Sequence, residues 1–194
     1  MRRIIFISTL LLFICVSSFG MAFNNHRRGF IIGGLGGVGI DNWSMVDEDG
    51  VKIDSGNDIV IHIDLRIGVG FKGDRFILYY WGLGNTFLPD GSSGPTTSAI
   101  TGVGVSYYFK PIAPSFYVNA GFGAHMFIRR LYGDYWLFGY TEEMYKGLGI
   151  MGGIGYEFAR HWSVECGVMW GNPSYEEAKI NSFAISLSII GIAY

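Results

Sequence analysis

The chain has 194 residues and a formal net charge of −2; 15% of its residues are charged, 16% are aromatic and 30 are glycine. This length predicts one domain, and so mild an acidic balance does not favour nucleic-acid binding. The shortage of charged side chains points to a membrane protein or an all-β protein. After the first 22 residues no run reaches the ~20 apolar residues of a spanning helix, so any membrane crossing would use strands.

The first segment has the features of an export signal. Two arginines form a positive n-region, residues 4–16 are apolar, and a small-x-small cleavage site ends at Ala22. We expect residues 1–22 to be a signal peptide and residues 23–194 to form the domain. The alternative, an uncleaved anchor helix, is disfavoured because the apolar run is short.

The clearest pattern beyond this segment lies in residues 59–71. Seven large apolar side chains alternate there with a second set that contains His62, Asp64 and Arg66. A period of two is typical of a β-strand with one apolar and one polar face. Eight segments of this kind occur, each about as long as a tilted membrane strand. They are residues 29–40, 59–71, 76–86, 98–109, 116–128, 147–158, 162–171 and 182–194.

The connections between these segments alternate between long and short. They are, in chain order, 41–58, 72–75, 87–97, 110–115, 130–146, 159–161 and 172–181. Short turns at one end and long loops at the other are typical of outer-membrane barrels. Aromatic residues beside the short turns predict a girdle at that rim, and Trp81 and Trp170 predict a thinner one at the opposite rim. The pattern predicts an all-β fold, an eight-stranded antiparallel up-and-down transmembrane β-barrel.

Residues 155–165, with the sequence Gly-Tyr-Glu-Phe-Ala-Arg-His-Trp-Ser-Val-Glu, are similar to the strand-turn-strand hairpins of such barrels. The chain after residue 22 resembles the OmpA/OmpX-like family of small outer-membrane β-barrels. This resemblance implies a place in the bacterial outer membrane and contact with its lipid and lipopolysaccharide. The terminal aromatic residue, Tyr194, is similar to the signal that the barrel-assembly machinery recognises.

Two features of the last strands lead to further expectations. Cys166 is the single cysteine after residue 22 and falls on an apolar face, which predicts inert packing rather than reactivity. In the last segment, Ile190, Ile192 and Tyr194 leave the phase of the preceding apolar residues. That change predicts a bulge or a change of phase near Ile189.

An eight-stranded barrel is just wide enough for its own side chains to fill it. The polar faces predict an interior network of His62, Asp64, Arg66, Asn119, His125, Arg129, Glu157 and Glu165. We expect Arg66 to pair with Glu157 or Glu165. A structural, closed interior is favoured over the alternative, the ion gate of a small pore.

The long connections differ in character. Residues 41–58 carry six acidic side chains and one lysine, which favours a solvated acidic loop over a calcium site, because the alternate oxygen ligands of a calcium loop are incomplete. Residues 130–146 are rich in aromatic side chains. Candidate contacts to an external surface ligand are Tyr132, Tyr135, Trp136, Phe138 and Tyr140. Alternatively, these rings extend the barrel wall.

Two further alternatives are weighed against this interpretation. His161 and Ser163 have a spacing similar to that of lipid A deacylases, but the orienting acids, Glu176 or Glu177, belong to the opposite end of the barrel. A secreted, lipocalin-like barrel would need a charged outer face, which is missing. We expect a non-enzymatic barrel without metal or cofactor, serving envelope structure or surface interaction.

Overall fold

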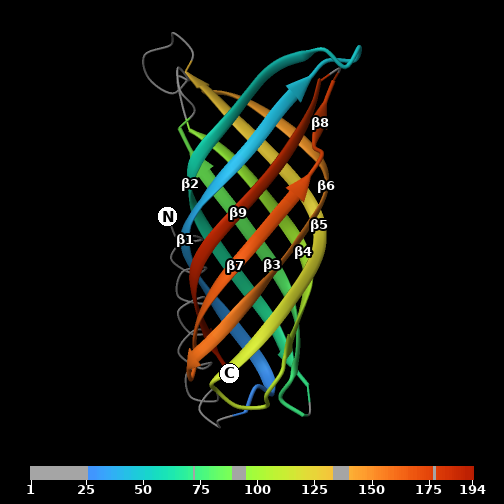
Figure 1. The fold of residues 1–194 in the computed structure, drawn as a ribbon. Helices are drawn as coiled ribbons and strands as arrows, with labels where there is room; N and C mark the ends of the chain where they lie inside the picture. The colour runs from blue at the N-terminus through green and yellow to red at the C-terminus, as the bar shows by residue number, and fades with distance from the viewer. Residues whose placement is uncertain (1–25, 72, 89–94, 133–139, 177) are drawn as a thin grey trace, which may run out of the picture.

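The computed structural model describes residues 26–71, 73–88, 95–132, 140–176 and 178–194, so the predicted signal peptide lies outside it. Every strand pairing is antiparallel, and β1 pairs with the last strand, which closes the sheet into a barrel (Figure 1). The predicted eight-stranded up-and-down barrel is confirmed, with one short additional strand, β8. The strands are β1 (Gly29–Val46), β2 (Lys52–Gly70), β3 (Phe76–Phe87), β4 (Thr96–Tyr108), β5 (Ser115–Tyr132), β6 (Tyr140–Ala159), β7 (Trp162–Gly171), β8 (Ser174–Tyr175) and β9 (Ala178–Ala193).

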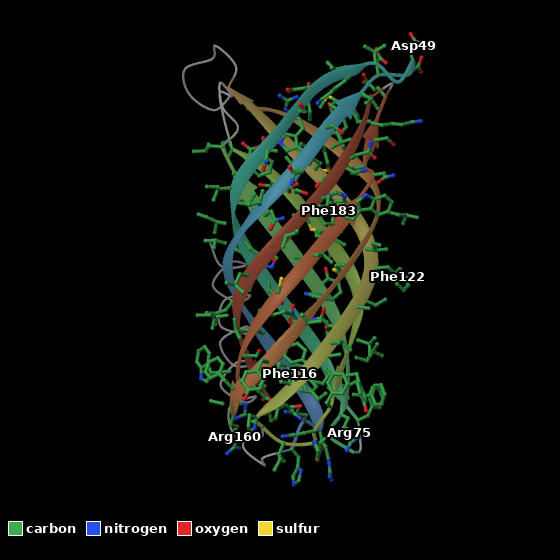
Figure 2. The ribbon with its side chains drawn as sticks, in the orientation of Figure 1. Asp49, Arg75, Phe116, Phe122, Arg160 and Phe183 are labelled. Atoms are coloured by element: carbon green, nitrogen blue, oxygen red, sulfur yellow. The ribbon has the colours of Figure 1, made fainter. Side chains whose placement is uncertain are left out.

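The barrel has two distinct ends. Asp49 lies at one end, called the hairpin end, and Arg75 and Arg160 lie at the other, called the turn end (Figure 2). The turn between β2 and β3 closes through a hydrogen bond that the backbone NH of Phe71 donates to the backbone oxygen of Phe76 (3.0 Å). No helix among the described residues is long and apolar enough to cross a membrane.

The outer wall of the barrel is apolar and the inner wall is mixed. Six outward side chains of β2, from Ile59 to Val69, are between 37% and 82% exposed, whereas His62, Asp64 and Arg66 between them are buried. A continuous apolar exterior of this kind is suited to contact with hydrocarbon rather than water. This orientation contradicts the lipocalin-like alternative, in which the apolar face would surround a ligand inside.

The strands are longer than the sequence predicts, and residues 41–58 do not form a loop. β1 and β2 stay paired as far as Val46 and Lys52, and only residues 47–51 form the turn. Asp47 closes this turn, because its carboxylate accepts a hydrogen bond from the backbone NH of Val51 (2.7 Å). The predicted loop 130–146 is likewise mostly strand, since β5 continues to Tyr132 and β6 begins at Tyr140.

β7 is the shortest of the long strands, and β8 continues the wall above it. β7 ends at Gly171, while its neighbours β6 and β9 extend farther towards the hairpin end. Ser174 of β8 pairs with Lys146 of β6 and with Lys179 of β9. The predicted loop 172–181 is therefore part of the barrel wall.

The predicted bulge or change of phase near Ile189 is wrong. β9 pairs with β1 and with β7 in unbroken register. Ile190, Ile192 and Tyr194 point into the barrel, where they are buried, while Ile189 and Leu187 face outward. Both faces of this strand are apolar near the turn end, and the sequence pattern therefore resembles a change of phase.

The predicted girdles also need correction. Trp81 is buried inside the barrel and is not part of an outer girdle, and Tyr117 and Tyr194 point inward as well. Trp170 is exposed, as expected of a rim residue, and Cys166 is exposed on the same outward face of β7. An exposed aromatic band does surround the turn end. Its large apolar members are Phe30, Phe71, Phe76, Phe109, Phe116, Phe158 and Trp162.

Candidate functional site

The centre of the barrel holds a buried charge cluster, termed the central layer. Arg66 donates from Nε and Nη2 to both carboxylate oxygens of Asp64 (2.9 and 2.7 Å), and Nη2 also donates to Oε1 of Glu165 (2.6 Å). The indole of Trp81 donates a hydrogen bond to Asp64 (3.1 Å). The guanidinium carbon of Arg66 lies over the same indole, 4.6 Å from the centre of the ring. The hydroxyl of Tyr117 donates to Oε2 of Glu165 (2.7 Å). Each buried charge in this layer therefore has opposite charge or donors beside it.

The turn end is closed by a second cluster, the turn-end layer. Arg27, which precedes β1, inserts its buried guanidinium into the barrel, where it pairs with Glu157 and donates to the backbone oxygen of Lys110 (2.9 Å). Its guanidinium also lies 3.9 Å from the ring centre of Tyr108. The hydroxyl of Tyr194 donates to the same carboxylate, Glu157 (2.7 Å). The segment before the first strand thus seals this mouth.

The flanking residues anchor this segment from outside. Arg28 donates to both carboxylate oxygens of Asp74 (2.6 and 3.1 Å), and the ring of His26 bonds the same carboxylate (2.7 Å). Asp74 lies in the β2–β3 turn with a φ of 61°, a conformation that an aspartate tolerates better than most residues. Residues 26–28 and Asp74 are together called the clamp.

A polar layer follows on the hairpin side of the central layer. His62 bonds the side-chain oxygen of Asn85 (2.8 Å), and the hydroxyl of Ser98 bonds His125 (3.0 Å). Asp41, fully buried, accepts a hydrogen bond from Ser182 (3.0 Å). These groups come from β1, β2, β3, β4, β5 and β9 and bond one another across the lumen.

An apolar plug closes the barrel nearest the hairpin end. Its members come from six strands and are all buried: Trp43, Met45, Val60, Phe87, Phe127, Tyr145 and Ile180. Phe127 lies at its centre, with ring centres of Trp43 and Phe87 at 5.6 and 6.3 Å. The cavity between the central and polar layers measures about 10 Å³, about the space of one water molecule. Side chains of these four layers therefore occupy the lumen of the described barrel at successive heights.

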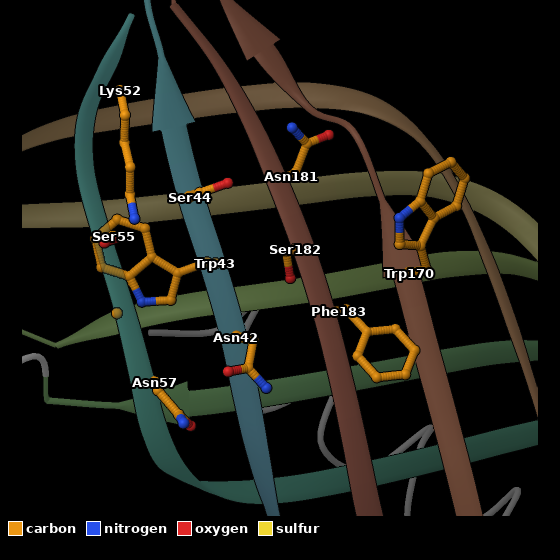
Figure 3. A pocket seen from close by; sticks show the side chains of 11 residues that line it. Asn42, Trp43, Ser44, Lys52, Ser55, Asn57, Trp170, Asn181, Ser182 and Phe183 are labelled. Carbon is orange, nitrogen blue, oxygen red and sulfur yellow. The ribbon is translucent and has the colours of Figure 1, made fainter.

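A groove occurs on the outer surface of the wall, near the hairpin end (Figure 3). This wall groove has a volume of about 520 Å³ and crosses β2, β1, β9 and β7. Its outward side chains are Asn42, Ser44, Asn57, Trp170, Asn181 and Phe183, with Lys52 at one edge.

Comparisons with known proteins agree with this architecture. Ail, the attachment invasion locus protein of Yersinia pestis, in complex with the heparin analogue sucrose octasulfate, matches over 84% of this chain and 99% of its own, with 9% identity and a TM-score of 0.51. Neisserial surface protein A matches over 84% of this chain and 96% of its own, with 14% identity and a TM-score of 0.52. The fold is that of a small outer-membrane β-barrel. No protein-family model and no curated protein sequence matches the chain.

The predicted interior residues of this β-barrel divide among its layers. Asp64, Arg66 and Glu165 come together in the central layer, whereas Glu157 binds Arg27 instead of Arg66. His62 and His125 lie in the polar layer on separate hydrogen bonds. Two residues predicted for the interior network do not join it. Arg129 bonds Asp54 near the mouth (3.1 Å) and is partly exposed. Asn119 is buried, but its side chain bonds none of the described groups.

Sequence reasoning missed Arg27 and the apolar plug. Arg27 stands before the first periodic segment, so no alternation places it in the barrel. Trp43, Met45 and Tyr145 fall in segments that resemble loops, although the odd-numbered positions from Asp41 to Met45 continue the inward phase of β1. Extending that phase past Ile40 is the signal that could have found them.

The candidate loop contacts have mixed outcomes. Tyr135, Trp136 and Phe138 lie outside the described residues. Tyr132 and Tyr140 are paired at the backbone level as the last partners of β5 and β6. Tyr145, which the sequence assigns to the same exposed segment, is buried in the apolar plug instead.

Of the six acidic residues of 41–58, only Asp47, Glu48 and Asp49 lie in the hairpin turn, and the other three belong to paired strands. Asp41 is inside the barrel, Asp54 pairs with Arg129, and Asp58 accepts a hydrogen bond from the indole of Trp43 (2.8 Å). Across the described ranges, no three His, Cys, Asp or Glu side chains form a group that could hold a metal ion.

The deacylase-like arrangement does not assemble among the described residues. The ring of His161 bonds the backbone oxygen of Ile192 (2.8 Å), and the hydroxyl of Ser163 is inside the barrel beside Tyr117 (3.2 Å). Glu176 follows β8 at the hairpin end, whereas His161 precedes β7 at the turn end (Figure 1). A nucleophile, base and acid separated in this way cannot form a catalytic relay.

Proposed function

We propose that the chain is a non-enzymatic outer-membrane β-barrel with a closed, structural interior, and that its hairpin end faces the outside and contacts other surfaces. The observation that carries the proposal is the filled lumen: the turn-end layer, the central layer and the apolar plug close the same barrel at three heights. A barrel closed in this way offers a stable platform for its outer end rather than a passage.

The apolar wall supports a membrane location. Rings of Phe, Tyr and Trp beside the short turns would lie at one lipid boundary, where aromatic bodies contact lipid and polar tips contact headgroups. The export signal predicted for residues 1–22 supports delivery through the periplasm. The barrel-assembly machinery is the expected partner for insertion, given the aromatic C-terminus.

The surface partner is constrained by charge. Ail is known in complex with a sulfated sugar analogue, whereas the tip of the β1–β2 hairpin carries Asp47, Glu48 and Asp49. Acidic groups repel sulfate, so we expect a partner that is not strongly anionic at this tip. The aromatic segment that contains Tyr135, Trp136 and Phe138 supplies the candidate contacts.

The compartment and orientation can be tested together. We expect the folded protein in the outer-membrane fraction, with heat-modifiable migration on gels. Trypsin added to intact cells should cleave at Lys52, next to the hairpin turn, and should spare Arg75 and Arg160 at the turn end. Recovery in the soluble periplasmic fraction without detergent would contradict the proposal.

The closed and non-enzymatic character needs separate measurements. In planar bilayers we expect no sustained conductance above the lipid baseline, and a sustained conductance that disappears when Arg66 is substituted would establish a gated pore instead. Overexpression should leave lipid A mass spectra unchanged, and a new deacylated species would identify the enzymatic alternative.

A further inference from the structure

The wall groove lies where the outer surface changes from apolar to polar. One cross-strand row, Ile59, Ile40, Ile185 and Val168, is formed by exposed aliphatic side chains. The next row towards the hairpin end contains Asn57, Asn42, Phe183 and Trp170, and the row after it contains Ser55, Ser44 and Asn181. A groove at this boundary would face the headgroup region of the bilayer.

Three carboxamides of the groove have no side-chain partner within the described chain, whereas the inward Ser182, which also lines it, bonds Asp41. The carboxamides of Asn42, Asn57 and Asn181 point outward and make no hydrogen bond there with other described residues. Each carboxamide offers two donors and one acceptor oxygen. Beside hydrocarbon, such groups are costly unless a headgroup bonds them.

The remaining lining completes an amphipathic site. Trp170 and Phe183 are about two-fifths exposed and offer aromatic faces on which the CH faces of a sugar ring can pack. Lys52, at the opposite edge, supplies an ammonium that can bind phosphate. The volume of about 520 Å³ is within the range of small-molecule sites.

We propose that the wall groove binds the phosphorylated saccharide headgroup of an outer-leaflet glycolipid, of the lipopolysaccharide class. The carboxamides bond sugar hydroxyls, the aromatic pair packs on a sugar face, and Lys52 contacts a phosphate. A phospholipid headgroup offers fewer hydroxyls to three carboxamides and is the poorer match. This inference rests on the outer-membrane location proposed above.

The test is native mass spectrometry of the intact barrel in detergent, titrated with a deep-rough lipopolysaccharide. The groove variants are Trp170→Ala and the double variant Asn42→Ala/Asn57→Ala. Their matched controls are Trp162→Ala, on the same face of β7 at the other rim, and Thr86→Ala, an outward polar residue of β3. Heat-modifiable migration identifies the variants that have folded, and phosphatidylglycerol and inorganic phosphate serve as competitors.

We expect each groove variant to raise the dissociation constant for the glycolipid about tenfold or more, because each loses several contacts, while the controls stay within about twofold. Neither competitor should displace the glycolipid at equal concentration. Equal binding by groove and control variants, displacement by phosphatidylglycerol, or no binding by the wild type would overturn the site. A barrel absent from the outer-membrane fraction would contradict the proposed function itself, independently of the titration.

Discussion

Arg66 is the residue on which the central layer depends. Among the residues that the structure describes, it is the one cation within bonding distance of both Asp64 and Glu165. Arg66→Met keeps an unbranched side chain against Trp81 but leaves two buried carboxylates without a cation. We expect a loss of about 3–5 kcal/mol in the free energy of unfolding, which is typical when one partner of a buried pair is removed. Denaturant titration of the refolded barrel in detergent micelles measures it.

Arg129→Met is the matched control for this change. Its pair with Asp54 is partly exposed, with side-chain exposures of 22% and 41%, and exposed pairs contribute less than about 1 kcal/mol. Comparable losses for the two variants would show that burial does not determine the role of Arg66.

A second prediction at the scale of one residue concerns the space beside Gly155. It lies opposite Tyr117 in the β5–β6 pairing, and a Cβ at this position would overlap the Tyr117 ring. Gly155→Ala should displace the ring that bonds Glu165, at a cost of about 1–3 kcal/mol. The measurement is the same denaturant titration, with Gly82→Ala as control because a Cβ at Gly82 meets no atom within 4 Å. A neutral Gly155→Ala would mean that the ring has room to move.

At the scale of elements, the clamp should respond to pH. Burial alone would raise the pKa of the Asp74 carboxyl, but the hydrogen bonds from Arg28 and His26 outweigh burial, and the pKa lies below its ordinary value. A lowered pKa in the folded state stabilises the fold above the unfolded pKa of about 3.9. This contribution is lost as the pH falls through the lower, folded value.

The prediction is that Asp74→Asn lowers the melting temperature at pH 7 and that the difference from the wild type disappears in strong acid. Thermal unfolding of both proteins between pH 2 and pH 7 measures it. A difference that persists unchanged at pH 2 would show that the ionised carboxylate is not what holds the clamp.

The parts of the strands that form the apolar outer wall could be predicted because apolar and polar side chains alternate there. The predicted strand 59–71, whose residues 59–70 belong to β2, has the correct phase, including the inward positions of Asp64 and Arg66. Beyond these parts the outward residues become Asn and Ser, so the apolar alternation ends although backbone pairing continues to Lys52. The segments expected to be loops are paired strands for this reason.

The interior could be predicted only in part, because a phase shows which side a residue faces and not which partner it meets. Arg66 was expected to bond Glu157 or Glu165, and the tilt and register of the strands bring Glu165 to it. Glu157 lies nearer the turn end, where Arg27 enters from outside the strand pattern. The apolar plug was not predicted because the pattern is reversed near the hairpin end, where the inward residues are apolar and the outward residues are polar. Trp43 and Met45 therefore do not continue the apolar outward face, and they resemble loop residues.

At the scale of the whole molecule, the closures act in series along one lumen. The turn-end layer, the central layer and the apolar plug rest on different residues, namely Arg27, Arg66 and Phe127, and each fills the lumen at its own height. Ions must pass all three layers, so opening one of them leaves the other two closed. The barrel should therefore stay closed to ions even when the side chains of one layer are truncated.

Three closures in series predict how variants of the barrel conduct ions. Arg27→Ala, Arg66→Ala and Phe127→Ala should each remain at the lipid baseline in planar bilayers, whereas the triple variant should conduct, provided that heat-modifiable migration shows it to be folded. The reason is that an eight-stranded lumen becomes continuous only when every filling layer is truncated. If a single substitution produced sustained channels, one layer would be the gate, and the other two would have to be permeable in the native barrel.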